Sequence, residues 1–490
     1  MQDRGGAATR RKIVSIATWI SALFLLIGAE PGRAAAPRPG VSGEQVYAYA
    51  VAQTNFGPRR PGTVAYEQAR DHIRGLLNGF GLKTWTDAIP TRQYFAKTWR
   101  LEALSPQGHL LDGFPMRHSG STPPAGLTAD LVDVGRGTAA DFRRRDVTGK
   151  IVLVGWGHRF FNLISLGALR DSYQRAVERG AAGYLQFFTN TPGNSYQLMT
   201  AAGPDDGRAI PGFSIGKEDA RDLQRLLRKG NVRLRLALDG EEREVEAHNL
   251  FGILPGRTDE VILIDTHYCS MFDGAVDNAS GTAAALALAE YFSRRPQAER
   301  EKTLVFCFYG THEYVDYKLG AQKFLADHSD LAAEVLVAIG LDHMAAWPDK
   351  EFFGHDTRIH LMTPVPGLDQ LRGVFVSNHP ALRRIVFPAL LRQRLLPFVV
   401  LPTGLLDAIK FGESEGDSLL DWVICESGPA YRLGAPTLRL MMAPQWYHTR
   451  LDTVEHFTPE QLKRVVDAHV EIIEAINRTP PEKFRGRMGR

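Results

Sequence analysis

Five side chains of the types that bind metal ions follow apolar segments far apart in this sequence. Imidazole with carboxylate suits zinc, and one aspartate can bridge two metals roughly 3.5–4 Å apart. Taken singly, each residue is more commonly structural, since a histidine near a strand end is often only hydrogen-bonded and an aspartate before a helix is often its cap. Together they predict a site for two divalent ions. They are His267, Asp277, Glu313, Asp342 and His448.

The segments around these residues alternate between strand-like and helix-like patterns. This alternation predicts an α/β fold with a mostly parallel sheet sandwiched by helices. Ligand sites in open α/β sheets lie at the carboxyl ends of the strands, so we expect the five side chains to meet at one edge of the sheet. The predicted strands are 261–267, 303–310, 334–344 and 437–442, and the predicted helices are 281–295, 318–328 and 460–478.

Glu313 belongs to the fragment GTHEYVD (310–316), which looks like half of the helical zinc-protease motif H-E-x-x-H. The second histidine of that motif would fall at position 316, where the sequence has Asp316. The fragment directly follows the apolar run 303–309, which is typical of a strand. Glu313 is therefore predicted to act from a strand end, with partner ligands far away in the sequence.

Residues 121–240 differ from the rest of the chain. Short apolar strands such as GKIVLVGWG, RGAAGYLQFF and IPGFSIG alternate there with glycines and helical stretches. We expect a small β-rich module inserted between the segments 37–120 and 241–480, with 481–490 as a C-terminal tail.

The whole chain has 490 residues, 44% of them hydrophobic, which is enough for two or three domains. Its net charge of +3 implies no nucleic-acid partner.

The N-terminus is typical of an export signal. A basic group at 9–12 precedes the apolar segment 13–28, and the small residues of GRAAAP follow. The apolar run is shorter than the ~20 residues that span a bilayer, so we expect residues 1–36 to be a cleaved signal peptide. The mature chain is then periplasmic or secreted, with no stable membrane span; a retained N-terminal anchor is the alternative.

From about residue 45 to 478 the chain resembles the zinc-dependent exopeptidases of the bacterial leucyl aminopeptidase and glutamate carboxypeptidase type. The likeness lies in THYCSMFDGAVDNASG, VFCFYGTHE, GLDHM and WYHTRLDT. The module 121–240 resembles the protease-associated domain, which makes 37–120 and 241–480 two segments of a catalytic domain. The resemblance implies two Zn²⁺ ions and a peptide or amino-acid amide substrate. A homodimer is a further expectation.

Carried over position by position, the resemblance implies that Asp277 bridges the two zinc ions. His267 and Asp342 would complete one zinc site, and Glu313 and His448 the other. Tyr447, next to the last ligand, is expected to contact the substrate. Whether an amino-terminal or a carboxy-terminal residue is removed stays open.

Two catalytic positions depart from the family pattern. The usual glutamate base is His312 here, and the aspartate that normally orients the first ligand histidine is Cys269. An imidazole with a pKa near ~6.5 can take and return a proton, or can itself bind zinc. Asp265 is another candidate for orienting His267.

We therefore expect an exported di-zinc exopeptidase with His312 as its base. The alternatives are a metal-binding homologue of weak or no activity that acts as a binding protein, and a hydrolase of a non-peptide amide.

Overall fold

The computed structural model describes residues 40–485, apart from 107, 157–165, 190, 199–208, 347–371, 402, 409–417 and 443–445. The described elements belong to the compact unit Val41–Arg490. The predicted signal peptide and most of the predicted C-terminal tail lie outside the described residues. Among the residues that are described, no helix is long and apolar enough to cross a membrane.

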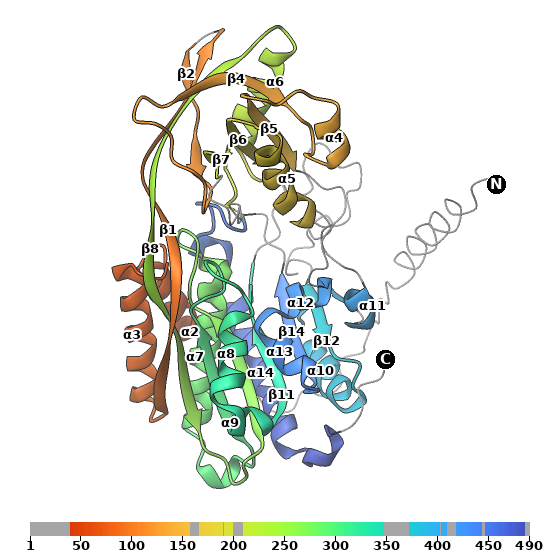
Figure 1. Cartoon of the computed structure of the whole chain (residues 1–490). Coiled ribbons are helices and arrows are strands. Elements are labelled where there is room, and N and C mark those ends of the chain that lie inside the picture. The colour runs from red at the N-terminus through yellow and green to blue at the C-terminus, as the bar shows by residue number, and fades with distance from the viewer. Residues whose placement is uncertain are drawn as a thin grey trace, which may run out of the picture. The chain divides into compact units, whose positions relative to one another are not determined.

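The central sheet is mixed and mostly parallel around the candidate site, as predicted (Figure 1). Its middle strands run in the order β14-β11-β9-β10, each parallel to its neighbour. Antiparallel strands follow on both sides, because β12 pairs with β14 and β8 pairs with β10. The strands are β8 (Arg233–Leu254), β9 (Val261–His267), β10 (Thr303–Tyr309), β11 (Val335–Leu341), β12 (Arg372–Val376), β13 (Phe398–Val400) and β14 (Thr437–Met442).

Helices cover both faces of this sheet, which is why its middle strands are apolar without alternation. Ile262 and Ile264 of β9 pack in one hydrophobic cluster, whereas Val261 and Leu263 pack in another. Successive side chains of a strand point to opposite faces, so both faces of β9 are buried. The helices include α2 (Gly43–Thr54), α3 (Val64–Gly79), α7 (Ser280–Ser293), α10 (Pro380–Arg392) and α14 (Pro459–Arg478) with the first cluster, and α8 (Leu319–Asp327) and α13 (Gly428–Arg432) with the second.

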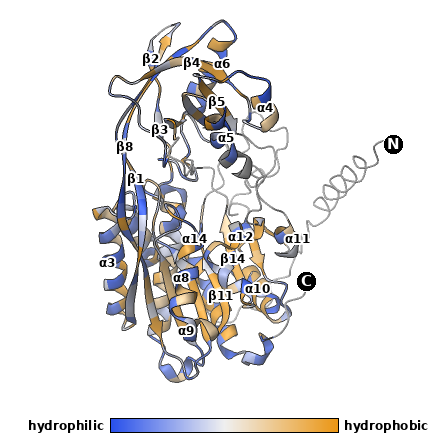
Figure 2. Ribbon diagram, viewed as in Figure 1, coloured by the Kyte–Doolittle hydropathy of each residue, from blue (hydrophilic) through white to orange (hydrophobic). Residues whose placement is uncertain are grey.

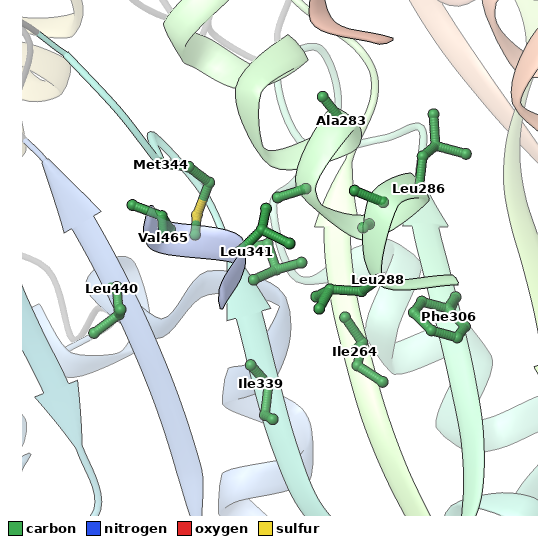
Figure 3. Packing of buried hydrophobic residues seen from close by; sticks show 14 of the residues in the cluster. Ile264, Ala283, Leu286, Leu288, Phe306, Ile339, Leu341, Met344, Leu440 and Val465 are labelled. Carbon is green, nitrogen blue, oxygen red and sulfur yellow. The ribbon is translucent and has the colours of Figure 1, made fainter. Parts of the chain in front are cut away.

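Figure 3 shows the first of these clusters from close by. The alanine-rich helix α7 lies against the sheet, and its small side chains allow a close approach to the strands. The position of α7 matters for function because its first turn directly follows Asp277. The labelled side chains are Ile264, Phe306, Ile339, Leu341 and Leu440 from strands, Ala283, Leu286 and Leu288 from α7, Met344, and Val465 from α14.

A long two-stranded ribbon leads from the central sheet into the inserted module. Strands β1 (Lys83–Ser105) and β8 pair antiparallel along nearly their whole length. The boundary predicted at residue 240 falls inside β8, so the domain limits stay predictions. Figure 2 shows mostly polar residues along the ribbon and apolar ones along β11. The module contains β4 (Leu127–Asp133), β5 (Ile151–Trp156), β6 (Gly183–Phe188), β7 (Gly212–Ile215), α4 (Ala139–Arg143), α5 (Leu166–Glu178) and α6 (Lys217–Leu227).

Candidate metal centre

The fold brings all five predicted ligands to the carboxyl end of the central strands. Four of them end or follow one of the parallel strands and the fifth lies just before a helix, so the parallel registers bring the strand ends together. The side chains are buried, with residue exposures between 0% and 7%. His267 ends β9, Asp277 lies in the turn before α7, Glu313 follows β10, Asp342 follows β11, and His448 lies in the segment after β14.

The two carboxylate oxygens of Asp277 face two different groups of side chains. His267 Nε2 lies 3.4 Å from Asp277 Oδ1 and 3.4 Å from Asp342 Oδ1. On the other side, His448 Nε2 lies 3.1 Å from Asp277 Oδ2 and 2.8 Å from Glu313 Oε2. These two groups, each with one imidazole and two carboxylates, have the donor types that hold a metal ion. A carboxylate shared in this way suits a pair of cations.

The atoms that face this space are buried and have no hydrogen-bond partner among the residues that the structure describes. Burying charged or polar groups without a partner is costly, and three carboxylates side by side repel one another. Divalent cations among these atoms would remove both penalties, so the side chains present fit a pair of them. The unpartnered atoms are His267 Nε2, Asp277 Oδ1 and Oδ2, Glu313 Oε1, Asp342 Oδ1 and His448 Nε2.

Backbone carbonyl groups orient both predicted histidine ligands. His267 Nδ1 lies 3.1 Å from the carbonyl oxygen of Cys269, and His448 Nδ1 lies 2.8 Å from that of Leu198. A proton on each Nδ1 can be donated to its carbonyl, which leaves the Nε2 lone pair directed at the carboxylates. Leu198 belongs to the module 121–240, so this module contributes to the geometry of the site.

The side chain of Cys269 lies within reach of His267 but makes a shorter contact elsewhere. Its sulfur accepts a hydrogen bond from the N–H of Glu313 at 3.4 Å and lies 3.9 Å from His267 Nδ1. Burial raises the pKa of the Cys269 thiol, which favours its neutral form. Asp265 does not orient His267, because it accepts a hydrogen bond from Ser427 Oγ at 2.7 Å. The shorter contact of His267 Nδ1 is with the backbone carbonyl of Cys269, and the sulfur of the same residue is its more distant neighbour.

Asp452 fixes the turn that carries Asp277, and sequence reasoning missed it. Its carboxylate accepts the N–H groups of Val276 at 2.7 Å and of Asp277 at 3.0 Å. Gly274 begins the turn at φ +52°, and a Cβ there would lie 2.4 Å from Ser270 Cβ. The sequence signal was available, since Asp452 lies in the WYHTRLDT segment.

A third imidazole, that of His343, also faces the carboxylates. Its Nε2 lies 3.2 Å from Asp277 Oδ1 and 3.5 Å from Asp342 Oδ1, while its Nδ1 lies 3.0 Å from the carbonyl oxygen of Met442. The left-handed backbone of His343, at φ +47°, directs the side chain inward. In the sequence His343 directly follows the predicted ligand Asp342, but no sequence pattern indicated that its side chain points toward the carboxylates.

The carboxylates dominate the electrostatics of the site. Burial alone would lower the pKa of His448, but Glu313 and Asp277 raise it to about 10. Burial alone would also lower the pKa of His343, which Asp342 and Asp277 raise to about 9. A cation at these atoms must compete with protons on the imidazoles, so metal affinity is expected to decrease as pH falls.

His312 and Tyr447 lie beside the predicted ligands. The ring of His312 is parallel to that of His267, with centroids 3.9 Å apart, and its side chain is 12% exposed. The ring of Tyr447 stacks on His448 with a centroid distance of 3.6 Å and lies 5.4 Å from that of His343. Tyr447 therefore supports these two histidines from one side.

Comparisons with known proteins agree with this fold and site. The family description "Peptidase family M28" matches residues 249–372, and "PA domain" matches 127–223. Aminopeptidase YwaD of Bacillus subtilis is 26% identical over 442 residues, which is 87% of this chain and 83% of that protein. The probable lipoprotein aminopeptidase LpqL of Mycobacterium tuberculosis is 24% identical over 317 residues, or 62% of this chain. The match spans only 58% of that relative's length.

Solved structures share the fold. A peptidase M28 precursor from Shewanella amazonensis SB2B has a TM-score of 0.69 at 19% identity, with 91% of this chain and 95% of that chain covered. The zinc aminopeptidase BSAP from Bacillus subtilis has a TM-score of 0.64 at 18% identity, with 92% and 100% covered. Fold and donor set together define a zinc-dependent exopeptidase of the aminopeptidase type. In this the chain matches peptidase family M28 over part of its length, with an inserted PA domain.

Proposed function

We propose that this protein is an exported aminopeptidase that removes the terminal residue of peptides or amino-acid amides at two Zn²⁺ ions. The observation that carries the proposal is the geometry of Asp277, whose two oxygens face separate groups of imidazole and carboxylate. Aminopeptidase activity is inferred from the relatives, which are named as aminopeptidases. Export is inferred from the signal-like N-terminus and from a relative named as a lipoprotein.

In this proposal, His267 and Asp342 would hold one zinc ion, and Glu313 and His448 would hold the other, with Asp277 shared. Zinc in such a site supplies Lewis acidity toward the scissile carbonyl and lowers the pKa of water. The backbone acceptors at Cys269 and Leu198 keep the imidazole lone pairs directed inward. The buried surroundings exclude bulk water, which strengthens every charge interaction at the reacting bond.

His312 is proposed as the general base. Its ring lies against a predicted ligand but remains partly exposed, as a group that must reach substrate would be. It would accept a proton from the attacking water and return a proton to the leaving amine, a contribution of roughly 10²–10⁴-fold to the rate. Tyr447, stacked on His448, would form one wall of the substrate site.

The test combines metal analysis with turnover. Purified protein should contain two zinc ions per chain and should release free amino acids from unblocked peptides or aminoacyl amides. Blocking the peptide's N-terminus should abolish the reaction. Asp277→Asn should lose bound zinc and slow turnover roughly 10²–10³-fold or more, because loss of metal removes several kcal/mol of stabilisation. Asp316→Asn is the control, because it changes an exposed residue in the segment that carries Glu313; it should change neither the zinc content nor the turnover.

A protein without bound metal would contradict the proposed site. Preferential cleavage of peptides with a free C-terminus and a blocked N-terminus would contradict the aminopeptidase assignment. A second function is favoured by the replacement of the usual glutamate by His312, which suits a metal-binding homologue that acts as a binding protein. Two bound zinc ions with no turnover of any peptide or amide would support that function.

A further inference from the structure

His312 is held on two sides. Its Nδ1 lies 2.5 Å from Oε1 of Glu426, and one face of its ring stacks on His267 at an interplanar angle of 14°. A carboxylate next to Nδ1 favours the tautomer that carries its proton there. The other nitrogen, Nε2, is then an acceptor. The two contacts thus determine both the plane of the ring and the nitrogen that can take a proton.

Glu426 is itself fixed. It lies in the short turn Cys425–Ser427, between α12 (Leu419–Ile424) and α13, and its residue exposure is 1%. Its second oxygen, Oε2, accepts a hydrogen bond from Arg439 Nη2 at 2.8 Å. Arg439 belongs to β14 and is fully buried, so it provides a rigid anchor. Burial alone would raise the pKa of Glu426, but His312 and Arg439 lower it to about 2.

We propose that Glu426 is a positioning residue for His312, with Arg439 holding its carboxylate in place. This inference rests on the proposed function, in which His312 acts as the base. Glu426 does not touch the reacting atoms in this arrangement. It holds the imidazole with Nδ1–H as a donor, so that Nε2 is the nitrogen offered to the attacking water and the leaving amine.

The pair also explains why a histidine works at position 312 in this chain. A glutamate there would place its carboxylate beside Glu426, in a region that already holds Asp265 and Asp342. Arg439 Nη2 is 3.9 Å from each of those two aspartates and already donates to Glu426, so this one guanidinium is shared among three carboxylates. Neighbouring like charges disfavour ionisation and orientation of both groups. A basic side chain at 312 therefore suits the negative charge at 426.

The test is a cycle of four proteins: the wild type, Glu426→Gln, His312→Glu, and the double variant. Glu426→Gln should lower kcat roughly 10–100-fold, as expected for a displaced catalytic group, with KM changed much less. His312→Glu alone should also be slower than the wild type. In the His312→Glu background, however, Glu426→Gln should raise kcat, because it removes the opposing carboxylate. A residue with only a structural role would lower activity in both backgrounds.

Two further measurements accompany the kinetics. Zinc content should stay the same in all four proteins, and protein with ¹⁵N-labelled histidine should lose one strongly hydrogen-bonded imidazole N–H signal in Glu426→Gln. Glu471→Gln removes another arginine-paired carboxylate, on α14, and should change neither kcat nor this signal. Thermal melting identifies a variant that fails to fold; if Glu426→Gln fails, Glu426→Asp replaces it and should shift the same signal.

An active wild type whose kcat is unchanged in Glu426→Gln would overturn the positioning role and leave the proposed function intact. A fall in kcat on Glu426→Gln in both backgrounds would likewise overturn it. A wild type that turns over no peptide or amide would overturn the proposed function, and the role of Glu426 with it.

Discussion

The hydrogen bonds of Asp452 provide a quantitative test of how the bridging ligand is held. The carboxylate is 1% exposed and accepts two buried backbone N–H groups, those of Val276 and Asp277. Asp452→Ala leaves both N–H groups without an acceptor. Each buried unsatisfied group costs about 1–3 kcal/mol, so the free energy of unfolding should fall by about 2–6 kcal/mol. Asp452→Asn keeps one oxygen that can accept a hydrogen bond, so its free energy of unfolding should decrease by about half as much as that of Asp452→Ala.

The same variants should bind zinc more weakly, because Asp277 loses the contact that fixes its position. Replacing a residue that orients a metal ligand typically costs 10–100-fold in affinity, so a decrease of roughly that size is expected for both variants. Chemical unfolding in the presence of a chelator measures stability without the contribution of bound metal. Zinc affinity is measured separately, by competition with a chelating dye.

Asp141→Asn is the matched control, since Asp141 also accepts a backbone N–H, that of Thr138 at 3.1 Å, in a cap within the module. It should lower the free energy of unfolding by about 1 kcal/mol and leave zinc affinity unchanged. The reasoning is refuted if Asp452→Ala and Asp452→Asn unfold at the wild-type denaturant concentration, or if both bind zinc as tightly as the wild type.

Two more predictions concern histidines. Burial lowers the pKa of His469 to about 4, below its ordinary 6.5, so the folded state keeps it neutral while the unfolded state takes up a proton. The free energy of unfolding should therefore decrease by up to about 3 kcal/mol as the pH falls from about 6.5 to about 4. His469→Leu should remove this part of the decrease. If the wild type and His469→Leu lose stability in parallel over this pH range, the prediction is wrong. His343→Ala should weaken zinc binding roughly 10–100-fold in dye competition, whereas His379→Ala, at another buried imidazole, should not.

Much of the fold followed from local patterns. Apolar runs such as 261–267 and 303–309 are strands because both of their faces are buried, and the structure confirms them as β9 and β10. The order of strands and helices required the parallel connections that place successive strand ends at one edge of the sheet. That is why residues as distant as His267 and His448 could be predicted to meet.

Tertiary packing determined which side chains contact one another within the site. Sequence patterns predict which residues lie at a strand end, but not which atoms come within hydrogen-bonding distance. Glu426 is 114 positions from His312, and no local pattern connects them. The backbone of Cys269, and not Asp265, orients His267, because the direction of each side chain depends on the turns around it. The inward direction of His343 likewise needs a left-handed backbone that only surrounding contacts can maintain.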